Sequence, residues 1–316
     1  MSNILAINET VLNDAASILR AGGLVAFPTE TVYGLGGDAT NGQAVAKIYA
    51  AKGRPSFNPL IIHAADAADF EQLIEWNDKA KALAKAFWPG PLTMILPRKK
   101  SSTISLLASA GLQTLAIRVP SNPIALKLLQ TAGIPIAAPS ANASGQLSPT
   151  TAKHVADSLG NTVDMILDGG RTQIGVESTV LNMTTAVPVI LRPGGVTQEQ
   201  IEAVLNEKIE AFSGASDDSA PHSPGMLSSH YAPHIPLRMD AKQALEGEAF
   251  LAFGESAQHA ELNLSPKGDL HEAAANLFAM LHELDKPCYK GIAVAPIPNK
   301  ELGIAINDRL KRAAAK

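Results

Sequence analysis

Two cationic side chains, Lys52 and Arg54, flank a glycine in the segment KGRPSFNPLIIH, which begins at residue 52. Neither a helix nor a regular strand passes comfortably through Gly-Arg-Pro, so we predict a turn or loop here. Arginine offers a planar fork of donors and lysine a compact charge, and together they suit a phosphate chain. The alternative is a surface turn whose charges are solvated. The apolar residues 60–62 predict a buried strand that holds His63 at its end.

A second polar loop follows the apolar residues 134–138, which we predict to form a buried strand. Its sequence, PSANASGQLSPT at 139–150, carries Ser140, Asn142 and Ser148. Small residues with hydroxyl and amide groups between a strand and a helix suit close contact with phosphate or ribose. For Ser148 a second interpretation is that it caps the helix expected after Pro149.

A glycine-rich segment at 29–38 directly follows a predicted strand at 24–27 and carries Thr31 and Tyr33. In open α/β sheets, ligands bind beyond the carboxyl ends of the strands, so both side chains are candidate ligand contacts. The alternative is a glycine-rich turn in which the threonines only cap backbone groups.

Two more arginines occupy positions where a charged side chain is unusual. Arg118 interrupts an otherwise apolar strand at 115–119, so either an internal salt bridge or a ligand carboxylate must offset its desolvation. Both interpretations stay open at this point. Arg192 precedes Pro-Gly-Gly, which places one more cation on a rigid turn.

The elements that must position these residues follow from the periodicity of the apolar side chains. Helices are expected at 10–21, 42–52, 65–87 (one or two), 123–132, 198–209, 270–284 and 304–315. Strands are expected at 24–27, 60–62, 92–96, 115–119, 134–138, 163–168, 178–181, 187–191, 249–253 and 291–295. This is an α/β pattern, and 316 residues favour two domains because single cores rarely grow past about 250–300 residues.

The composition excludes several classes of protein. The single cysteine, Cys288, allows no intramolecular disulfide framework and indicates a reducing cytoplasm. The N-terminus lacks the pattern of a signal peptide, and no apolar run reaches the roughly 18 residues that span a bilayer. A net charge of −4 does not favour a broad grip on nucleic acid. His222, His230 and His234 lack acidic or cysteine ligands at fitting spacing, so we expect no metal site there.

Several motifs, taken together and in order, resemble one family. PTETVYGL at 28–35, KGRP at 52–55 with NPL at 58–60, WPGPLT at 88–93 and APSANASG at 138–145 resemble the YrdC-type domain. SPGM at 223–226 and HYAP at 230–233 resemble the interdomain linker of its two-domain members, the threonylcarbamoyl-AMP synthases. The resemblance implies an open, twisted mixed sheet with helices at 1–211, a linker at 212–235 and a smaller Rossmann-like α/β domain at 236–316.

The resemblance also implies an activity. L-Threonine takes up bicarbonate or CO2, and the resulting N-carboxythreonine attacks the α-phosphate of ATP to give threonylcarbamoyl-AMP and pyrophosphate. Mg2+ arrives with ATP, and no metal ligand is expected from protein side chains. A separate tRNA threonylcarbamoyl transferase complex then passes the group to the adenosine beside the anticodon.

The site residues carried over from the family fall into three sets. The phosphate-handling, catalytic set is Lys52, Arg54, Ser140 and Asn142. Further ATP contacts are Asn58, Thr114, Ser148, Arg192 and the linker residue Tyr231, which is expected to act as a lid. Threonine contacts are Thr31, His63, Arg118, Ala138 (through its backbone) and Ser178.

Two alternatives remain beside the synthase. One is a module that binds double-stranded RNA or tRNA, against which the acidic balance and the scarcity of aromatic residues argue. The other is a carbamoyl-adenylating domain of hydrogenase maturation, which shares the fold. Such domains come with acylphosphatase and zinc-finger modules, which this sequence does not contain. Weak RNA binding by a synthase also stays open.

Overall fold

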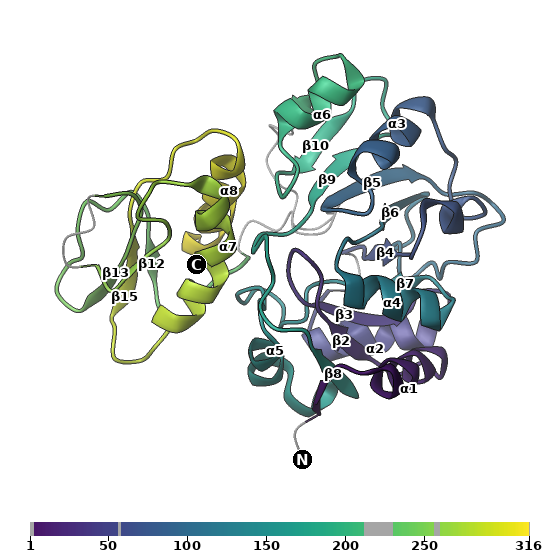
Figure 1. Cartoon of the computed structure of the whole chain (residues 1–316), viewed down its shortest axis with the longest axis horizontal. Coiled ribbons are helices and arrows are strands. Elements are labelled where there is room, and N and C mark those ends of the chain that lie inside the picture. Colours follow the sequence, from purple (N-terminus) through teal and green to yellow (C-terminus); the bar gives the residue numbers. More distant parts are fainter. Residues whose placement is uncertain (1–2, 56–57, 212–229, 256–259, 316) are drawn as a thin grey trace.

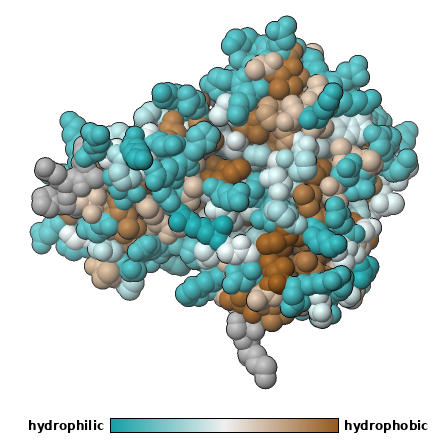
Figure 2. Space-filling view, in the orientation of Figure 1, coloured by the Kyte–Doolittle hydropathy of each residue, from teal (hydrophilic) through white to brown (hydrophobic). Residues whose placement is uncertain are grey.

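The computed structural model describes residues 3–55, 58–211, 230–255 and 260–315. Figure 1 shows a larger N-terminal body and a smaller C-terminal body, whose helices α7 and α8 face the larger one. On the face drawn in Figure 2, hydrophilic residues cover most of both bodies, and hydrophobic residues form smaller areas among the hydrophilic ones. Residues 212–229 of the predicted linker 212–235, including the motif at 223–226, lie outside the described residues.

The larger body is built on one mixed sheet. Parallel neighbours such as β4 and β6 alternate with antiparallel ones such as β2 and β3, as an open mixed sheet requires. In spatial order the strands are β1 (Ile4–Ala6), β8 (Met165–Asp168), β2 (Val25–Phe27), β3 (Gly34–Asp38), β7 (Ile136–Ala137), β4 (Ile61–His63), β6 (Thr114–Arg118), β5 (Leu92–Pro97), β9 (Thr179–Asn182), β10 (Val189–Arg192) and β11 (Glu210–Ala211). The predicted fold class is confirmed.

Helices cover both faces of this sheet. They are α1 (Glu9–Arg20), α2 (Gly42–Lys52), α3 (Asp78–Phe87), α4 (Pro123–Ala132), α5 (Ala152–Leu159) and α6 (Gln198–Leu205), with 3-10 turns η1 (Ala67–Phe70) and η2 (Gly160–Thr162). Apolar residues of α1 and α4 pack with β2 and β8 in one cluster. Those of α2, α3, α5 and α6 pack in another, which is the main core. The helices expected at 42–52 and 123–132 match α2 and α4 in their bounds.

The smaller body holds a four-stranded parallel sheet with the order β12 (Leu237–Arg238), β15 (Gly291–Val294), β13 (Glu248–Ala252) and β14 (Leu262–Asn263). Helices α7 (Leu270–Leu284) and α8 (Leu302–Ala314) complete it. Its apolar core also includes Val32, Leu147, Val176 and Tyr231. Because the first three of these come from the larger body, one hydrophobic cluster joins the two. We propose that the domains divide between β11 and β12, since these strands belong to different sheets.

The structure excludes two of the alternative interpretations of the sequence. The segment from Gly34 is the buried strand β3 rather than a continuation of the turn. Glycine normally weakens a strand, but a Cβ on Gly36 would lie 2.8 Å from the Phe27 ring, so close packing requires it. The helix after Pro149 is capped by the side chain of Thr151, which accepts from the His154 amide, and not by Ser148.

Candidate active site

The two polar loops that the sequence singled out meet at Lys52. Helix α2 ends at Lys52, and Gly53 closes it in the left-handed conformation that glycine adopts without strain. The Lys52 ammonium donates to the carbonyl of Ser140 at 2.6 Å and to the carbonyl of Asn142. In return, the backbone amide of Ser144 donates to the Lys52 carbonyl at 2.7 Å. Residues about 90 positions apart therefore form one polar wall.

Arg54 lies beside Lys52 and is also buried. Its guanidinium donates to the carbonyls of Asn58 and Pro59 at 3.4 and 3.2 Å. Burial lowers the pKa of Lys52 well below its ordinary value, and the neighbouring Arg54 adds to this effect. Burial likewise lowers the pKa of Arg54, to about 10. Two buried cations in adjacent positions are what a polyanionic ligand would stabilise.

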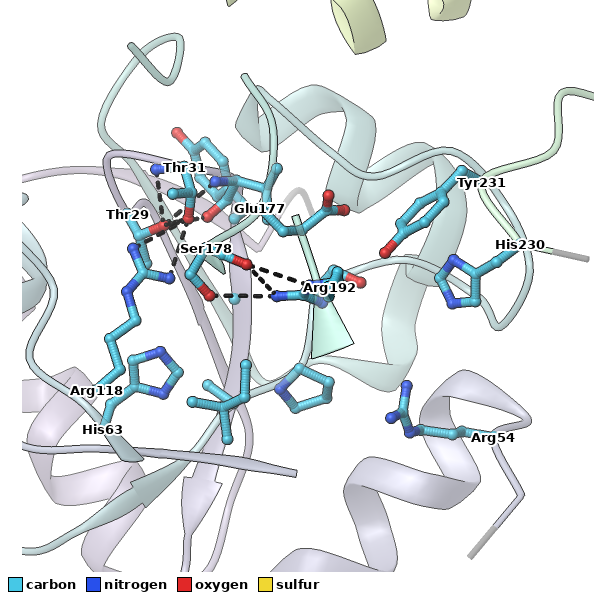
Figure 3. Close-up of a pocket in the computed structure, with 17 residues that line it drawn as sticks. Thr29, Thr31, Arg54, His63, Arg118, Glu177, Ser178, Arg192, His230 and Tyr231 are labelled. Atoms are coloured by element: carbon cyan, nitrogen blue, oxygen red, sulfur yellow. Dashed lines mark hydrogen bonds between the residues drawn. The ribbon is translucent and has the colours of Figure 1, made fainter. Parts of the chain in front are cut away.

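A cavity of about 50 Å³ lies against this wall (Figure 3). Nine residues carried over from the family line it: Thr31, Arg54, His63, Arg118, Ala138, Ser140, Ser178, Arg192 and Tyr231. It is small beside the ~300–1,000 Å³ of typical ligand pockets. His230 and Tyr231 form part of its lining, so an occupant as large as a nucleotide requires this part of the wall to move.

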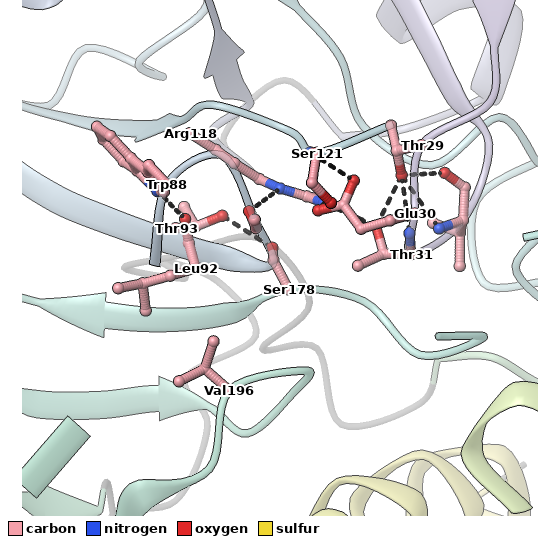
Figure 4. A network of polar contacts seen from close by, with 12 residues as sticks. Thr29, Glu30, Thr31, Trp88, Leu92, Thr93, Arg118, Ser121, Ser178 and Val196 are labelled. Carbon is pink, nitrogen blue, oxygen red and sulfur yellow. Dashed lines mark hydrogen bonds and ion pairs between the residues drawn. The ribbon is translucent and has the colours of Figure 1, made fainter. Parts of the chain in front are cut away.

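One end of the cavity is organised around Arg118 (Figure 4). Strands β4 and β6 pair in parallel with His63 opposite Arg118. The Arg118 guanidinium is paired with the carboxylate of Glu30 at 2.5 Å, and both side chains are 4% exposed. It also donates to Thr31 Oγ1 at 3.1 Å and to the Gly90 carbonyl at 3.2 Å. The internal salt bridge left open by the sequence therefore exists, and it holds a cation at the cavity wall.

Ser178 connects this end to Arg192. Its hydroxyl lies 2.8 Å from Thr93 Oγ1, and its carbonyl accepts from the Arg192 guanidinium at 2.9 and 3.2 Å. Gly194 follows the turn after Arg192, and a Cβ there would lie 2.3 Å from the Glu177 carbonyl. The Pro-Gly-Gly turn therefore needs its glycine for close approach to the segment that carries Glu177 and Ser178.

Several buried polar atoms without a protein partner lie in or beside the lining of the cavity. Among the described residues these include the Nδ1 atoms of His63 and His230, both amide atoms of Asn58 and the Oδ1 of Asn142. Native proteins rarely leave such groups unsatisfied, so these atoms are suited to hydrogen-bond a polar ligand. Burial lowers the pKa of both histidines to about 3, and the nearby Arg118 and Arg54, respectively, add to the effect. Both imidazoles are therefore neutral at ordinary pH.

The remaining family-derived residues lie behind the lining or away from it. Lys52 and Asn142 stand behind Ser140, and Asn58 stands behind Arg54. Ser148 donates from behind the wall to the Glu177 carboxylate at 2.5 Å. Thr114 lines a separate groove of about 400 Å³ between β5, β6, β9 and β10.

Sequence reasoning missed three ionisable residues of the site. Glu30 holds Arg118, Glu177 lines the cavity, and Arg309 from α8 pairs with Glu177 at 2.7 Å. The two carboxylates adjoin Thr31 and Ser178, and that adjacency was the available signal. For Arg309 the sequence offers none, because its partner lies 132 positions away.

The described residues contain neither a metal-binding cluster nor a membrane-spanning helix. No group of three or more histidine, cysteine, aspartate or glutamate side chains is placed to hold a metal ion there. None of the helices in that part of the chain has the length and apolar character needed to cross a membrane.

The fold and the cavity define an α/β protein with a buried site that combines a cationic wall and a second arginine-centred end. Comparison with known proteins makes this specific. A family model described as "Telomere recombination", for the Sua5, YciO and YrdC proteins, matches residues 17–194. A second, described as "Threonylcarbamoyl-AMP synthase, C-terminal domain", matches residues 196–315. The chain belongs to the Sua5/YrdC family of threonylcarbamoyl-AMP synthases, and the predicted resemblance is confirmed.

Relatives match along nearly the whole chain. The threonylcarbamoyl-AMP synthase of Bacillus subtilis is 45% identical, over 98% of this chain and 94% of that protein. The Pyrococcus abyssi synthase is 43% identical, over 98% and 95%. The crystal structure of P. abyssi Sua5 complexed with L-threonine superposes with a TM-score of 0.90 at 40% identity, covering 98% of this chain and 97% of that one.

Proposed function

We propose that this chain joins L-threonine, bicarbonate or CO2, and ATP into threonylcarbamoyl-AMP and pyrophosphate. The observation that carries the proposal is the lining of the cavity, which sets three buried arginines, Arg118, Arg54 and Arg192, around one space and so suits anionic partners. Family membership supports the same reaction, and a relative of 40% identity was crystallised with L-threonine.

We assign L-threonine to the Arg118 end. An arginine held by Glu30, Thr31 and Gly90 keeps its charge in a fixed place with one N–H of Nη1 still to donate, which suits the carboxylate of an amino acid. Thr31 and Ser178 offer hydroxyls within this network, and the His63 ring is neutral and has an unpaired nitrogen. These groups fit the hydroxyl and amine of threonine without adding a second charge.

We assign the triphosphate to the wall formed by Lys52, Arg54, Ser140 and Asn142, with Arg192 at its edge. Phosphoryl chemistry depends mainly on positioning and on electrostatic stabilisation of the charge that develops at phosphorus. Lys52 acts partly through the loop, because its ammonium fixes the carbonyls of Ser140 and Asn142. Asn58, Ser148 and Thr114 are proposed as further nucleotide contacts, Thr114 from the neighbouring groove.

The proposed reaction has two steps. The threonine amine adds to bicarbonate and loses water, or adds to CO2, to give a carbamate. A carbamate oxygen then attacks the α-phosphorus of ATP, and the bond to the bridging oxygen breaks with release of pyrophosphate. The chain's part is to hold the carbamate and the α-phosphate in line within a site shielded from water.

Mg2+ is proposed to enter with ATP as part of the substrate. The residues fit this arrangement, because Glu177, the carboxylate found among the described residues of the cavity lining, is already engaged by Arg309 and Ser148. The nucleotide phosphates therefore supply the magnesium ligands, and the metal would neutralise part of their charge.

Tyr231 is proposed as a movable part of the wall. It is 1% exposed, has a positive φ of 61° and packs against Phe278 with ring centroids 5.6 Å apart. A positive φ is uncommon for a bulky residue and is frequent where a segment switches. Tyr231→Ala is expected to raise the KM for ATP about tenfold by removing the contact. Unchanged ATP affinity and turnover would exclude the lid.

The product is proposed to pass to a tRNA threonylcarbamoyl transferase complex in the cytoplasm. The reducing compartment fits the single cysteine, Cys288, which is free and exposed. The acidic net charge of −4 argues against RNA binding as the main role. A gel shift with plain duplex RNA at rising salt tests that alternative.

The experiment for the main proposal mixes the purified chain with Mg-ATP, bicarbonate and L-threonine and follows pyrophosphate release. Release is expected only with threonine present, and mass spectrometry should find threonylcarbamoyl-AMP. D-Threonine and L-valine serve as matched controls, because the first has the opposite configuration and the second has a methyl group in place of the hydroxyl. ATP turnover indifferent to threonine would instead favour a carbamoyl-adenylating domain.

A further inference from the structure

The C-terminal domain inserts one arginine into the wall of the cavity. Arg309 lies on α8, and its side chain has no exposed surface. It is the largest of the fully buried side chains described in the structure. Burying a guanidinium costs desolvation free energy unless all of its donors are hydrogen-bonded. The partners of Arg309 therefore indicate its role.

Its main partner is the carboxylate of Glu177, which lies 2.7 Å away and is 6% exposed. Glu177 is the sole carboxylate among the described residues that line the cavity, next to Arg54, Arg118 and Arg192. Left unpaired, a carboxylate at this place would repel a triphosphate and would compete with it for the cations. The pairing with Arg309 cancels that charge.

Arg309 also contacts the segments on either side of Glu177. Its guanidinium donates to the carbonyl of Pro193, directly after Arg192, at 3.0 Å. Its central carbon lies 5.1 Å from the centre of the Tyr231 ring, within cation–π range. One side chain therefore touches the Arg192 turn, Glu177 and the proposed lid, all on the nucleotide side of the cavity.

A second carboxylate keeps Arg309 in place. Asp308 pairs with it at 2.6 Å and also with Arg312 at 3.0 Å. Burial opposes the charge of Arg309, yet its pKa is raised because Tyr231, Glu177 and Asp308 attract the cation. The guanidinium is charged at every ordinary pH, and Asp308 still pairs with it when Glu177 is altered.

We propose that Arg309 is a positioning residue for ATP, through which docking of the C-terminal domain neutralises Glu177 and fixes the Arg192 turn. The proposal rests on the proposed function, and it gives the C-terminal domain a part in the site beyond carrying the linker. It assigns no chemical step to Arg309, which stands behind the cavity wall and does not line it.

The test uses the full chain with five variants: Arg309→Met, Arg309→Lys, Glu177→Gln, the double variant Arg309→Met/Glu177→Gln, and Arg238→Met. Glutamine keeps an acceptor for Ser148 while it removes the charge. Arg238 is the matched control, because it pairs with Glu248 at 2.5 Å within the same domain and away from the cavity. Initial rates of pyrophosphate release are measured while ATP and threonine are varied separately.

Arg309→Met is expected to raise the KM for ATP at least about tenfold, because a buried carboxylate loses its partner beside the triphosphate. The KM for threonine should change less than about twofold, since Glu30 and not Glu177 holds Arg118. Arg309→Lys should restore part of the loss. The double variant should recover most of the ATP affinity, because the repelling charge is gone.

A merely structural Arg309 gives a different pattern. The double variant would then be no better than Arg309→Met, and both KM values would rise together as the melting temperature falls. If Arg309→Met does not fold, the Glu177→Gln variant alone tests the proposal. The proposal predicts that this variant has a lower KM for ATP than the wild type, and a higher KM for ATP overturns it. Wild-type threonine-dependent pyrophosphate release is measured alongside, so failure of the proposed function is recognised separately.

Discussion

Two buried arginine–carboxylate pairs stand beside the cavity and differ in where their partners come from. Arg118 and Glu30 belong to the same sheet domain, and the pair is fixed when that domain folds. Arg309 and Glu177 come from different domains, and their pair exists only when the two are docked. Both pairs lie at 2.5 to 2.7 Å and are almost fully buried.

The difference indicates how the two substrates are handled. The end proposed for threonine is preorganised within one domain, so its affinity should not depend on the C-terminal domain. The end proposed for ATP is completed by Arg309 of the other domain and by Tyr231 of the linker. Binding at that end can therefore be coupled to domain docking, since a ligand shifts an equilibrium between arrangements by its differential affinity for them. The following predictions test this contrast.

The largest effect is expected for Arg118→Ala. The change leaves Glu30 buried without its cation, which should lower the free energy of unfolding by about 3–5 kcal/mol, and it removes the proposed contact to the threonine carboxylate. Urea denaturation measures the first and pyrophosphate release the second. Arg118→Lys should recover stability better than threonine affinity, because one ammonium cannot replace a forked donor. Equal recovery of both would contradict the assignment.

Lys52→Met is expected to lower kcat/KM for ATP by a factor of about 10² to 10³, a typical cost of removing one electrostatic contact to a transition state. Lys47→Met is the matched control, because Lys47 lies on the same helix and donates to the Gly22 carbonyl at 2.7 Å. The control should keep its ATP kinetics. A similar loss in both variants would mean that helix α2 matters only for stability.

Stability should fall as the pH drops from 7 to 5. His63 and His230 have folded pKa values of about 3, against an ordinary value of 6.5. Below pH 6.5 the unfolded chain binds protons that the folded chain does not, so the free energy of unfolding decreases with falling pH. Each histidine contributes up to about 2 kcal/mol of this loss at pH 5. His63→Gln should give a shallower pH dependence, and an unaltered one would refute the burial argument.

The smallest effect is expected for Arg238→Ala, which breaks the pair with Glu248. The arginine side chain is 39% exposed and its partner 15%, so solvent screens the interaction. The free energy of unfolding should fall by no more than about 1 kcal/mol, with unchanged kinetics. A loss of unfolding free energy as large as that of Arg118→Ala would show that burial does not determine how much these ion pairs contribute to stability.

The sequence predicted the parts of the fold that local patterns encode. The expected helices 42–52, 123–132 and 270–284 match the observed bounds, because apolar periodicity and capping residues such as Gly53 and Gly133 define them. Strand β3 was missed because its glycines carry no apolar pattern, and its reason is close packing against Phe27. The sequence suggested Ser148 as the helix cap, whereas the structure uses Thr151. Both are hydroxyl residues near Pro149, so the sequence does not distinguish them.

The site shows the same division. The loops of Lys52 and Ser140 could be found from composition and position along the chain, and the structure brings them within hydrogen-bonding distance. For Arg118 the sequence left an ion pair and a ligand as alternatives; the structure shows the ion pair, while the ligand remains a proposal. Arg309 could not be found, because a lone arginine on a predicted helix looks like a solvated charge until the domains are docked.

The most direct test measures pyrophosphate release by Arg118→Lys and Arg309→Met over full ranges of threonine and ATP. The account predicts opposite selectivity, with a raised KM for threonine alone in Arg118→Lys and a raised KM for ATP alone in Arg309→Met. If both variants raised both constants to the same extent, the two ends of the cavity would not be separate sites, and the account would be contradicted.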